Sequence, residues 1–193
     1  MAVNLSKGQK VSLFKGNKQL SRVTVGLGWS TNKYKGGAEF DLDASAFLLN
    51  DGGRVTSDKD FVFYNNPKHP SGSIWSTGDN RTGSDSSGDD EQLKLDLLLT
   101  PDDIERIVFV VTIYEAKMRK QNFGLVSNSF IRVIDTSTEE EIARYDLTED
   151  FSDETAVIVG GFERNGANWE FKAVGDGFKG GLEELCRKFG VNI

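Results

Sequence analysis

The sequence predicts a mostly β protein: an antiparallel β-sandwich of two sheets, with about ten strands and two or three short helices. Short apolar or β-branched runs recur along the 193 residues, and Gly, Asn or Ser/Thr turns separate them. Hydrophobic residues make up 37% of the chain and 13 residues are Phe, so a packed core is available without disulfides. No linker-like stretch or repeat of fixed period interrupts the pattern. We therefore expect a single β-sandwich domain over residues 1–193.

The first half of the chain predicts strands on both sides of an acidic segment. The predicted strands are residues 10–14, 22–27, 40–49, 61–64, 74–76 and 92–99. The first two flank a polar Gly/Asn turn and are expected to pair with each other. In residues 40–49 (FDLDASAFLL), period-two alternation places Leu42, Ala44 and Leu48 on one face and the acids on the other. Residues 74–76 lead into the acidic segment and residues 92–99 leave it, so we expect the sheet to hold both its ends.

The second half of the chain predicts further strands and three short helices. Its strands are residues 107–114, 129–135, 141–147, 155–162 and 169–174. Residues 107–114 (IVFVVTIY) are apolar throughout, which is typical of a central strand buried on both faces. Thr100 followed by Pro101 and two acids predicts a short helix, with Thr as N-cap and Pro at the first helical position. Residues 115–121 and 183–189 are the other two expected helices.

The overall charge argues against several classes of partner. The formal net charge is −7 and the pI is about 4.8, whereas nucleic-acid binding needs basic stripes that replace phosphate counterions. Attraction to an anionic membrane surface is disfavoured for the same reason. The sequence shows no run of about 18 apolar residues and no apolar segment near the N-terminus. We therefore expect a cytoplasmic protein with no nucleic-acid partner and no direct membrane insertion.

One Cys (Cys186) and one His (His69) limit the chemistry further. An intrachain disulfide is impossible, and a structural zinc site needs four Cys or His ligands. A Ser-His or Cys-His nucleophile would have to use His69, which lies in a proline-flanked turn. The sequence therefore predicts no catalytic residues, and the lone thiol lacks the partner that dithiol chemistry requires.

The acidic segment, residues 78–91 (GDNRTGSDSSGDDE), is the main candidate for a binding site. Five of its fourteen residues are acids and only Arg81 opposes them. Massed carboxylates repel one another, so a folded domain exposes them to solvent or neutralises them with a cation. Hard oxygen donors in a glycine-rich loop suit Ca²⁺, which takes about 6–8 oxygen ligands in flexible geometry. A solvated acidic loop is the alternative.

A second source of carboxylates would strengthen the metal interpretation. Two acids lie side by side at the start of predicted strand 40–49, where the acidic segment could meet them. The acids of this set are Asp41, Asp43, Asp79, Asp89, Asp90 and Glu91. Their six negative charges exceed what one Ca²⁺ neutralises, so either two ions bind close together or some acids lie outside the coordination shell.

Further oxygens could come from neighbouring strand ends, and the EF-hand pattern does not apply. Asn65 and Asn66 can supply neutral oxygens, although Asn at a strand end also closes turns. Glu115 closes predicted strand 107–114 and could reach the same cluster. Counting twelve positions from Asp79 puts Arg81 where an EF-hand needs an acid or amide, so that loop type is excluded.

Several long motifs in fixed order resemble the TerD family of bacterial tellurite-resistance and general stress proteins. They are FDLDASAFLL, DFVFYNN, GDNRTG followed by GDDE, VFVVTIYEA, FIRV, ARYDLTED and AVGDGFKGGLEELC, and they span essentially the whole chain. The resemblance implies a β-sandwich that binds one or two Ca²⁺ ions at clustered acids. The six acids named above match the family's acidic motifs. Asn65, Asn66, Asn80 and Glu115 match neighbouring motif positions.

The resemblance also implies a function and partners. Family members are linked to tellurite resistance, other stresses, and complexes with proteins of the same operon, including a membrane-protein partner. The first hypothesis is a non-catalytic calcium-binding stress protein whose Ca²⁺-ordered acidic surface docks such partners. The alternative is a metal-assisted nucleotide-binding protein or phosphate-ester hydrolase. The glycine-rich stretches GLGWS and GDGFKGG lack the GxxxxGK[ST] phosphate-binding pattern, which disfavours the alternative.

Overall fold

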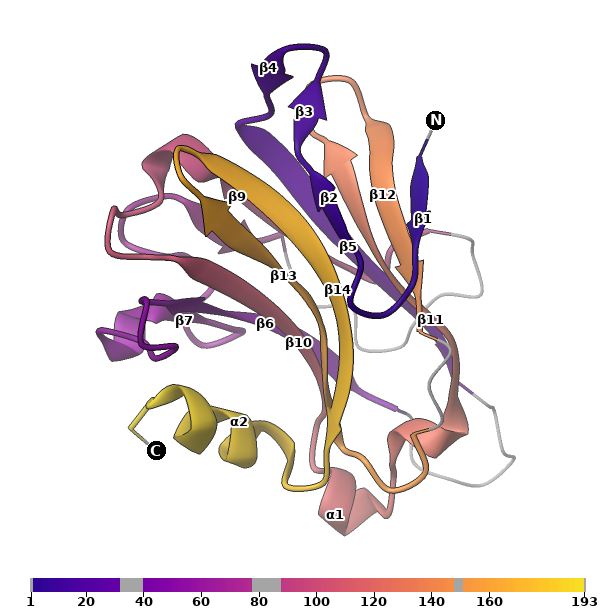
Figure 1. Cartoon of the computed structure of the whole chain (residues 1–193). Coiled ribbons are helices and arrows are strands. Elements are labelled where there is room, and N and C mark those ends of the chain that lie inside the picture. The colour runs from indigo at the N-terminus through magenta and orange to yellow at the C-terminus, as the bar shows by residue number, and fades with distance from the viewer. Residues whose placement is uncertain (1, 32–39, 78–87, 148–150, 193) are drawn as a thin grey trace.

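A computed structural model of the chain describes residues 2–31, 40–77, 88–147 and 151–192. Within these ranges, two six-stranded sheets face each other (Figure 1). Sheet A has the order β1 (Val3–Leu5), β12 (Glu140–Asp146), β11 (Val126–Asp135), β5 (Arg22–Thr31), β9 (Glu91–Asp96), β8 (Ile74–Ser76). Sheet B has the order β2 (Lys10–Ser12), β14 (Asn168–Phe178), β13 (Ala156–Asn165), β10 (Arg106–Ile113), β6 (Leu42–Leu49), β7 (Phe61–Val62).

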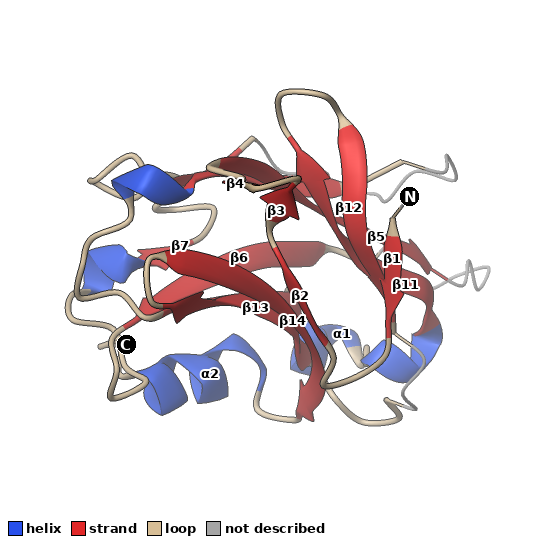
Figure 2. Cartoon of the chain, turned by 45° about the horizontal axis from the view of Figure 1, so that its top comes forward, coloured by secondary structure: helices blue, strands red, loops and turns tan. Residues whose placement is uncertain are grey.

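The remaining elements lie outside the two strand layers (Figure 2). A hairpin of β3 (Phe14–Lys15) and β4 (Lys18–Gln19) forms a separate two-stranded sheet. The helices are α1 (Ala116–Arg119) and α2 (Gly181–Phe189), with 3-10 turns η1 (Asp58–Asp60), η2 (Leu97–Leu99) and η3 (Phe123–Leu125). None of the helices in the described ranges is long and apolar enough to cross a membrane.

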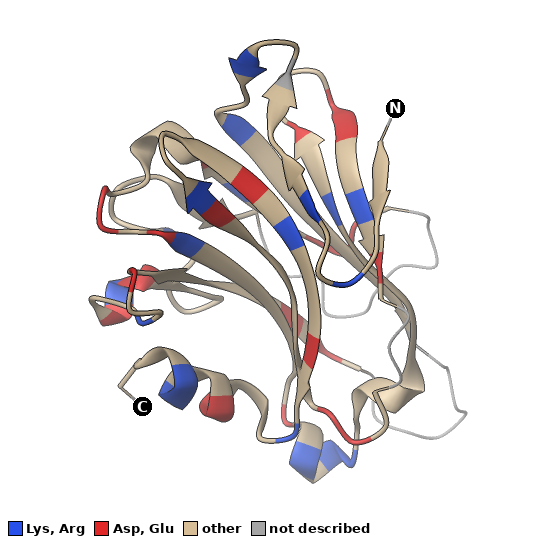
Figure 3. Cartoon of the chain, viewed as in Figure 1, with Lys and Arg blue, Asp and Glu red and all other residues tan. Residues whose placement is uncertain are grey.

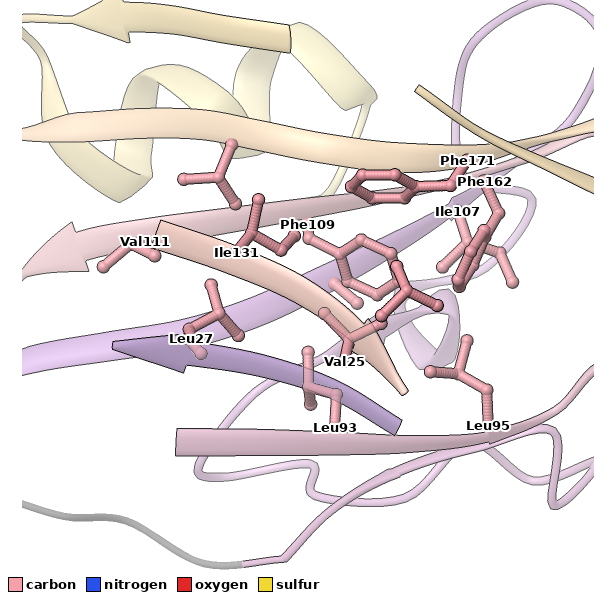
Figure 4. Close-up of a cluster of buried hydrophobic side chains, with 14 of the residues drawn as sticks. Val25, Leu27, Leu93, Leu95, Ile107, Phe109, Val111, Ile131, Phe162 and Phe171 are labelled. Atoms are coloured by element: carbon pink, nitrogen blue, oxygen red, sulfur yellow. The ribbon is translucent and has the colours of Figure 1, made fainter. Parts of the chain in front are cut away.

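The main core fills the space between the sheets, because alternate residues of each strand point inward. Figure 4 shows side chains of β5 and β9 pointing toward those of β10, β13 and β14. Phe109 and Phe162 meet edge to face with ring centroids 5.4 Å apart, and Phe162 meets Phe171 at 5.7 Å. Such edge-to-face pairs stabilise a core beyond the area that they bury.

A second apolar cluster lies on the outer face of sheet B, where α2 packs. Phe47 of β6 stacks on Phe61 of β7 and contacts Phe189 of α2, with ring centroids 4.3 and 4.7 Å apart. Leu185 and Cys186 complete the buried side of α2. Sheet B is therefore buried on both faces, which explains why β6 turns apolar on both faces after Ser45.

The predicted fold class is confirmed: the chain is a β-sandwich whose strands pair antiparallel, except that β1 pairs parallel with β12. As predicted, β10 is central, between β13 and β6. The acidic segment connects β8 to β9, which are neighbours in sheet A. The described part of the chain forms fourteen strands, more than about ten, because strands as short as β1, β3 and β4 carry too few apolar residues to be recognised in the sequence.

Three local predictions were wrong. The first two predicted strands do not pair: β2 joins β14 in sheet B and β5 joins β11 and β9 in sheet A. The helix predicted from Thr100 is a turn, in which the Ile104 N–H donates to the Pro101 carbonyl at 3.1 Å. The predicted strand 92–99 ends early, because the Asp96 carboxylate accepts from the Leu98 N–H at 3.2 Å and starts η2. β10 begins at Arg106, which leaves too few residues for a helix after η2.

Two leucines of this region allow a test of how much burial in the core contributes to the free energy of unfolding. Leu93 is 1% exposed between the sheets and Leu98 is 80% exposed. We expect Leu93→Ala to lower the free energy of unfolding by about 2–5 kcal/mol, because it leaves a cavity. The matched change Leu98→Ala should cost less than about 0.5 kcal/mol. Urea unfolding of both variants measures the difference, and equal losses would contradict this assignment of the core.

Candidate metal site

The predicted strand-end acids lie at one end of the sandwich. There β6 begins and β10 ends, with Ile113 opposite Leu42 and the Tyr114 N–H donating to the Asp41 carbonyl at 2.8 Å. At the same end β9 begins, with Glu91 opposite Leu27 of β5. Acids of the β6, β9 and β10 strand ends therefore lie at the same end of the sandwich. Over the rest of both sheets, residues of both signs are mixed (Figure 3).

Glu91 connects the two sheets at this end. Its side chain points inward with Leu93 and Leu95 of β9, and the residue is only 7% exposed. One carboxylate oxygen, Oε2, accepts from the Ala44 N–H of β6 at 2.6 Å. This N–H lies on the edge of β6 beyond the end of β7, so the carboxylate satisfies a donor that no strand covers. Glu91 therefore has a structural role in addition to any ligand role.

Asp90 and Asp89 point in two other directions. The Asp90 carboxylate accepts from the Trp29 N–H at 2.8 Å and holds the end of β5. The Asp89 carboxylate lies on the outer face of sheet A, above Gly26, where any Cβ would collide with it. There it accepts from Arg132 Nε at 2.6 Å and Gln92 Nε2 at 2.9 Å, and its side chain is 1% exposed. Asp89 thus already has a cationic partner within the protein.

The Arg132–Asp89 contact affects the arginine as well. The hydrogen bond to Asp89 raises the pKa of Arg132 above its ordinary value, although partial burial opposes this, and Glu141 adds a second carboxylate 3.2 Å away. Sequence reasoning missed this partner, because Arg132 is 43 residues from Asp89 along the chain and no local pattern links them.

A cleft of about 260 Å³ lies at the acidic end, beside the β6–β7 edge of sheet B and the β8–β9 edge of sheet A. Asp43 of β6 and Glu91 of β9 line it, together with Tyr64, Ser76 and Thr77. Tyr64, Ser76 and Thr77 were not predicted as site residues. The sequence signal for the last two is their place directly before the acidic segment. Asp79 and Asn80, which follow Thr77 in the sequence, lie outside the described residues.

Glu115, Asn65 and Asn66, which were also predicted as ligands, are not among the residues that line the cleft. Glu115 has left-handed backbone geometry (φ 51°) at the corner between β10 and α1, and its carboxylate lies 3.5 Å from Arg119 Nε. Asn65 is exposed in the turn after β7. Asn66 closes that turn, because its amide nitrogen donates to the Phe61 carbonyl at 2.7 Å.

The cleft residues fit a hard cation in type. Their donors are carboxylate and hydroxyl oxygens, which suit Ca²⁺ and disfavour soft-ligand metals. Among the described residues, no three His, Cys, Asp or Glu side chains are grouped closely enough to hold a metal. A complete coordination shell would therefore need oxygens from residues 78–87 in addition to Asp43 and Glu91. Whether the ten predicted ligands bind Ca²⁺ stays a prediction.

His69 belongs to a separate, buried hydrogen-bond network. Its Nδ1 accepts from the Ser71 N–H at 3.2 Å, so Nε2 carries the proton toward Asp60 Oδ1, 3.1 Å away. The other Asp60 oxygen accepts from the N–H groups of Thr56 and Ser57. The imidazole therefore joins η1 to the 69–73 turn, and it lies outside the acidic cleft.

Comparisons with known proteins agree with this architecture. The TerD domain family model matches residues 1–189. Tellurium resistance protein TerD of Serratia marcescens is 50% identical over 192 residues, covering 100% of this chain and 99% of that protein. General stress protein 16U of Bacillus subtilis is 50% identical over 193 residues and 100% of both chains. The crystal structure of a telluride resistance protein (TerD) homologue from Streptomyces coelicolor superposes with a TM-score of 0.69 at 26% identity, covering 86% of this chain and 95% of that one.

The environment of Asp89 predicts a stability role. We expect Asp89→Asn to lower the free energy of unfolding by about 1–3 kcal/mol, because it weakens a buried charge-assisted hydrogen bond to Arg132. Asp146→Asn is the matched control, since Asp146 forms a 2.8 Å pair with Arg144 but its side chain is 59% exposed. That change should cost less than about 1 kcal/mol. Chemical denaturation in a chelating buffer measures both, and an unchanged Asp89→Asn protein would refute the structural role.

Proposed function

The chain belongs to the TerD family of tellurite-resistance and general stress proteins, and from this premise we propose that it is a non-catalytic Ca²⁺-binding member. The family resemblance of its motifs is confirmed by the full-length matches. The observation that carries the calcium proposal is the cleft that Asp43 of sheet B and Glu91 of sheet A both line, together with Ser76 and Thr77 directly before the acidic segment. The names of the relatives described above concern tellurium resistance and stress, and the calcium ion is our own inference.

In this proposal Ca²⁺ is held by Asp43 and Glu91 together with oxygens of residues 78–87. Bound calcium would supply positive charge that offsets the repulsion between these carboxylates. Asp89 and the Asp90 carboxylate, held by Arg132 and the Trp29 N–H, anchor the C-terminal end of the acidic segment to sheet A. Because hydrogen bonds within the protein already hold this end, the bound ion would have to position only the residues of the acidic segment that precede Asp89.

The ion-loaded acidic surface is proposed as a docking module. Its partners would be other proteins of the stress operon, including a membrane-protein partner, which the protein would meet from the cytoplasm. Relief of carboxylate repulsion by a bound ion converts an acidic segment into a defined surface, which is a common way for calcium to control binding. Docking of this kind requires no chemical reaction at the calcium site.

The non-catalytic part of the proposal is supported by the placement of the groups that could act as nucleophile or base. The lone His69 is 5% exposed and held by Asp60 and Ser71. Burial, and then the charge of Glu183, raises the pKa of the Cys186 thiol to about 11. A neutral buried thiol is a poor nucleophile and a poor reductant, which argues against direct reduction of tellurite by this protein.

Calorimetric titration of chelator-stripped protein with Ca²⁺ tests the metal site. We expect saturation at one or two equivalents, with little response to Mg²⁺, and a rise in the unfolding free energy of about 2.7 kcal/mol when free Ca²⁺ reaches 100 times the dissociation constant. Asp43→Asn and Glu91→Gln should each weaken binding about tenfold or more, because each removes a charged ligand but keeps an oxygen. Asp146→Asn serves as the control and should bind normally.

Absence of binding heat and of thermal stabilisation by Ca²⁺ would contradict the proposal and leave the acidic segment as a solvated loop. Turnover of a nucleotide in a panel assayed with Mg²⁺ or Mn²⁺ would instead support the hydrolase alternative.

The thiol can be tested separately. At pH 8 a thiol whose pKa is about 11 is roughly one-thousandth ionised. We expect a disulfide reagent to label native Cys186 at least about 100-fold more slowly than the urea-unfolded chain, because burial protects the thiol and suppresses its thiolate. Rapid labelling of the native protein would show that the C-terminal helix opens or that the thiol is activated.

A further inference from the structure

A second cavity, of about 320 Å³, lies on the outer face of sheet B, away from the acidic cleft. It borders Arg106, where β10 begins, whereas the acidic cleft lies where β10 ends. Its walls come from β10, β13 and β14 on one side and from the last turn of α2 on the other. No family motif or comparison described above assigns this cavity a role.

The hollow exists because β13 has glycine where its neighbours carry side chains. Gly161 lies opposite Val108 of β10 and Lys172 of β14. A Cβ at Gly161 would lie 2.8 Å from the Ile107 carbonyl oxygen, so the close approach of the two strands requires glycine. The remaining lining includes the apolar side chains of Val174 and Phe189. The result is an apolar hollow open at its rim.

The rim of this cavity is cationic in a chain that is acidic overall. Arg106, Lys172 and Lys188 line it, against one acid, Glu163. Glu163 is already paired, with Lys10 and with Lys172 Nζ at 3.4 Å. Burial alone would raise the pKa of Glu163, but the hydrogen bond from Lys10 and the charge of Lys172 outweigh it and lower that pKa. The Glu163 carboxylate is therefore ionised and committed to lysines.

Among the described residues, two rim cations have no carboxylate partner: Lys188, whose ammonium group lies 5.5 Å from the centroid of the Phe178 ring, and Arg106. Arg106 lies directly opposite Glu163 in the strand register, yet no hydrogen bond or ion pair of its side chain occurs among the described residues. Its half-buried guanidinium packs against the 50–53 turn, where a Cβ at Gly53 would lie 2.8 Å from Arg106 Nη2. A partly desolvated charge without a counterion is costly, and a guanidinium matches carboxylate, phosphate or sulfonate groups with paired hydrogen bonds.

We propose that this cavity binds a small organic anion, whose charged group contacts Arg106 and whose apolar body covers Val108, Val174 and Phe189. The volume lies at the lower end of the range for small-molecule sites, about 300–1,000 Å³. The other groove beside α2 provides a contrast. It is larger, about 580 Å³, and apolar, but its charged lining is Asp58, Glu183 and Arg187, which does not favour an anion.

The test uses the fluorescent probe 8-anilinonaphthalene-1-sulfonate and its uncharged analogue N-phenyl-1-naphthylamine on the full chain in a chelating buffer. We expect one sulfonate site per chain, with the sulfonate binding about tenfold or more tightly than the neutral analogue because only the sulfonate pairs with Arg106. Amide chemical shifts of Gly53, Gly160 and Gly161 should move on addition of the sulfonate. The chelator keeps this result independent of the calcium proposal.

Variants then separate this cavity from the groove on the other side of α2. Arg106→Gln should remove most of the preference for the sulfonate, and Arg106→Lys should retain part of it. Arg187→Gln removes an equal charge from the other groove and should leave the sulfonate affinity unchanged. Thermal unfolding verifies that each variant is folded. Equal binding of the two probes, unchanged affinity in Arg106→Gln, or shifts centred on Phe63 and Val191 would each overturn the proposal.

Discussion

The packing of the two sheets' inward faces is the constraint on which the rest of this structure depends. Phe109, Phe162 and Phe171 form edge-to-face contacts on the inward face of sheet B, which packs against the inward side chains of sheet A. Strand alternation then decides the direction of every neighbouring side chain. Glu91 is inward because Leu93 and Leu95 are inward. Its carboxylate then lies close enough to β6 to bond the Ala44 N–H, and an acid becomes a connection between the two sheets.

The same constraint divides three consecutive acids among three roles. Asp89 faces outward and pairs with Arg132, Asp90 bonds the backbone at the end of β5, and Glu91 turns into the gap between the sheets. Carboxylates that are adjacent in sequence therefore do not share one electrostatic environment. The protein uses part of its acidic segment to anchor that segment to the sandwich, while Glu91 also lines the cleft that Asp43 of the opposite sheet borders.

The two ends of β10 lie near sites of opposite charge. At the end where β10 finishes, the two acids Asp43 and Glu91 line the acidic cleft. Near the start of β10, Gly161 leaves a hollow with Arg106 at the rim. Glu163 could have neutralised Arg106, but its carboxylate pairs with Lys10 and Lys172 instead. β10 thus runs from the cavity with the cationic rim to the acidic cleft.

Local rules were sufficient for much of this protein. Period two in FDLDASAFLL placed Leu42, Ala44 and Leu48 on the core face, because alternation is a property of the strand itself. The residue inventory, with one His and one Cys, limited the chemistry before any fold was known. Tertiary structure alone decided that β2 pairs with β14 instead of β5 and that Arg132 engages Asp89. These outcomes depend on partners distant along the chain, which compete for the same donor or edge only after the sheets have packed.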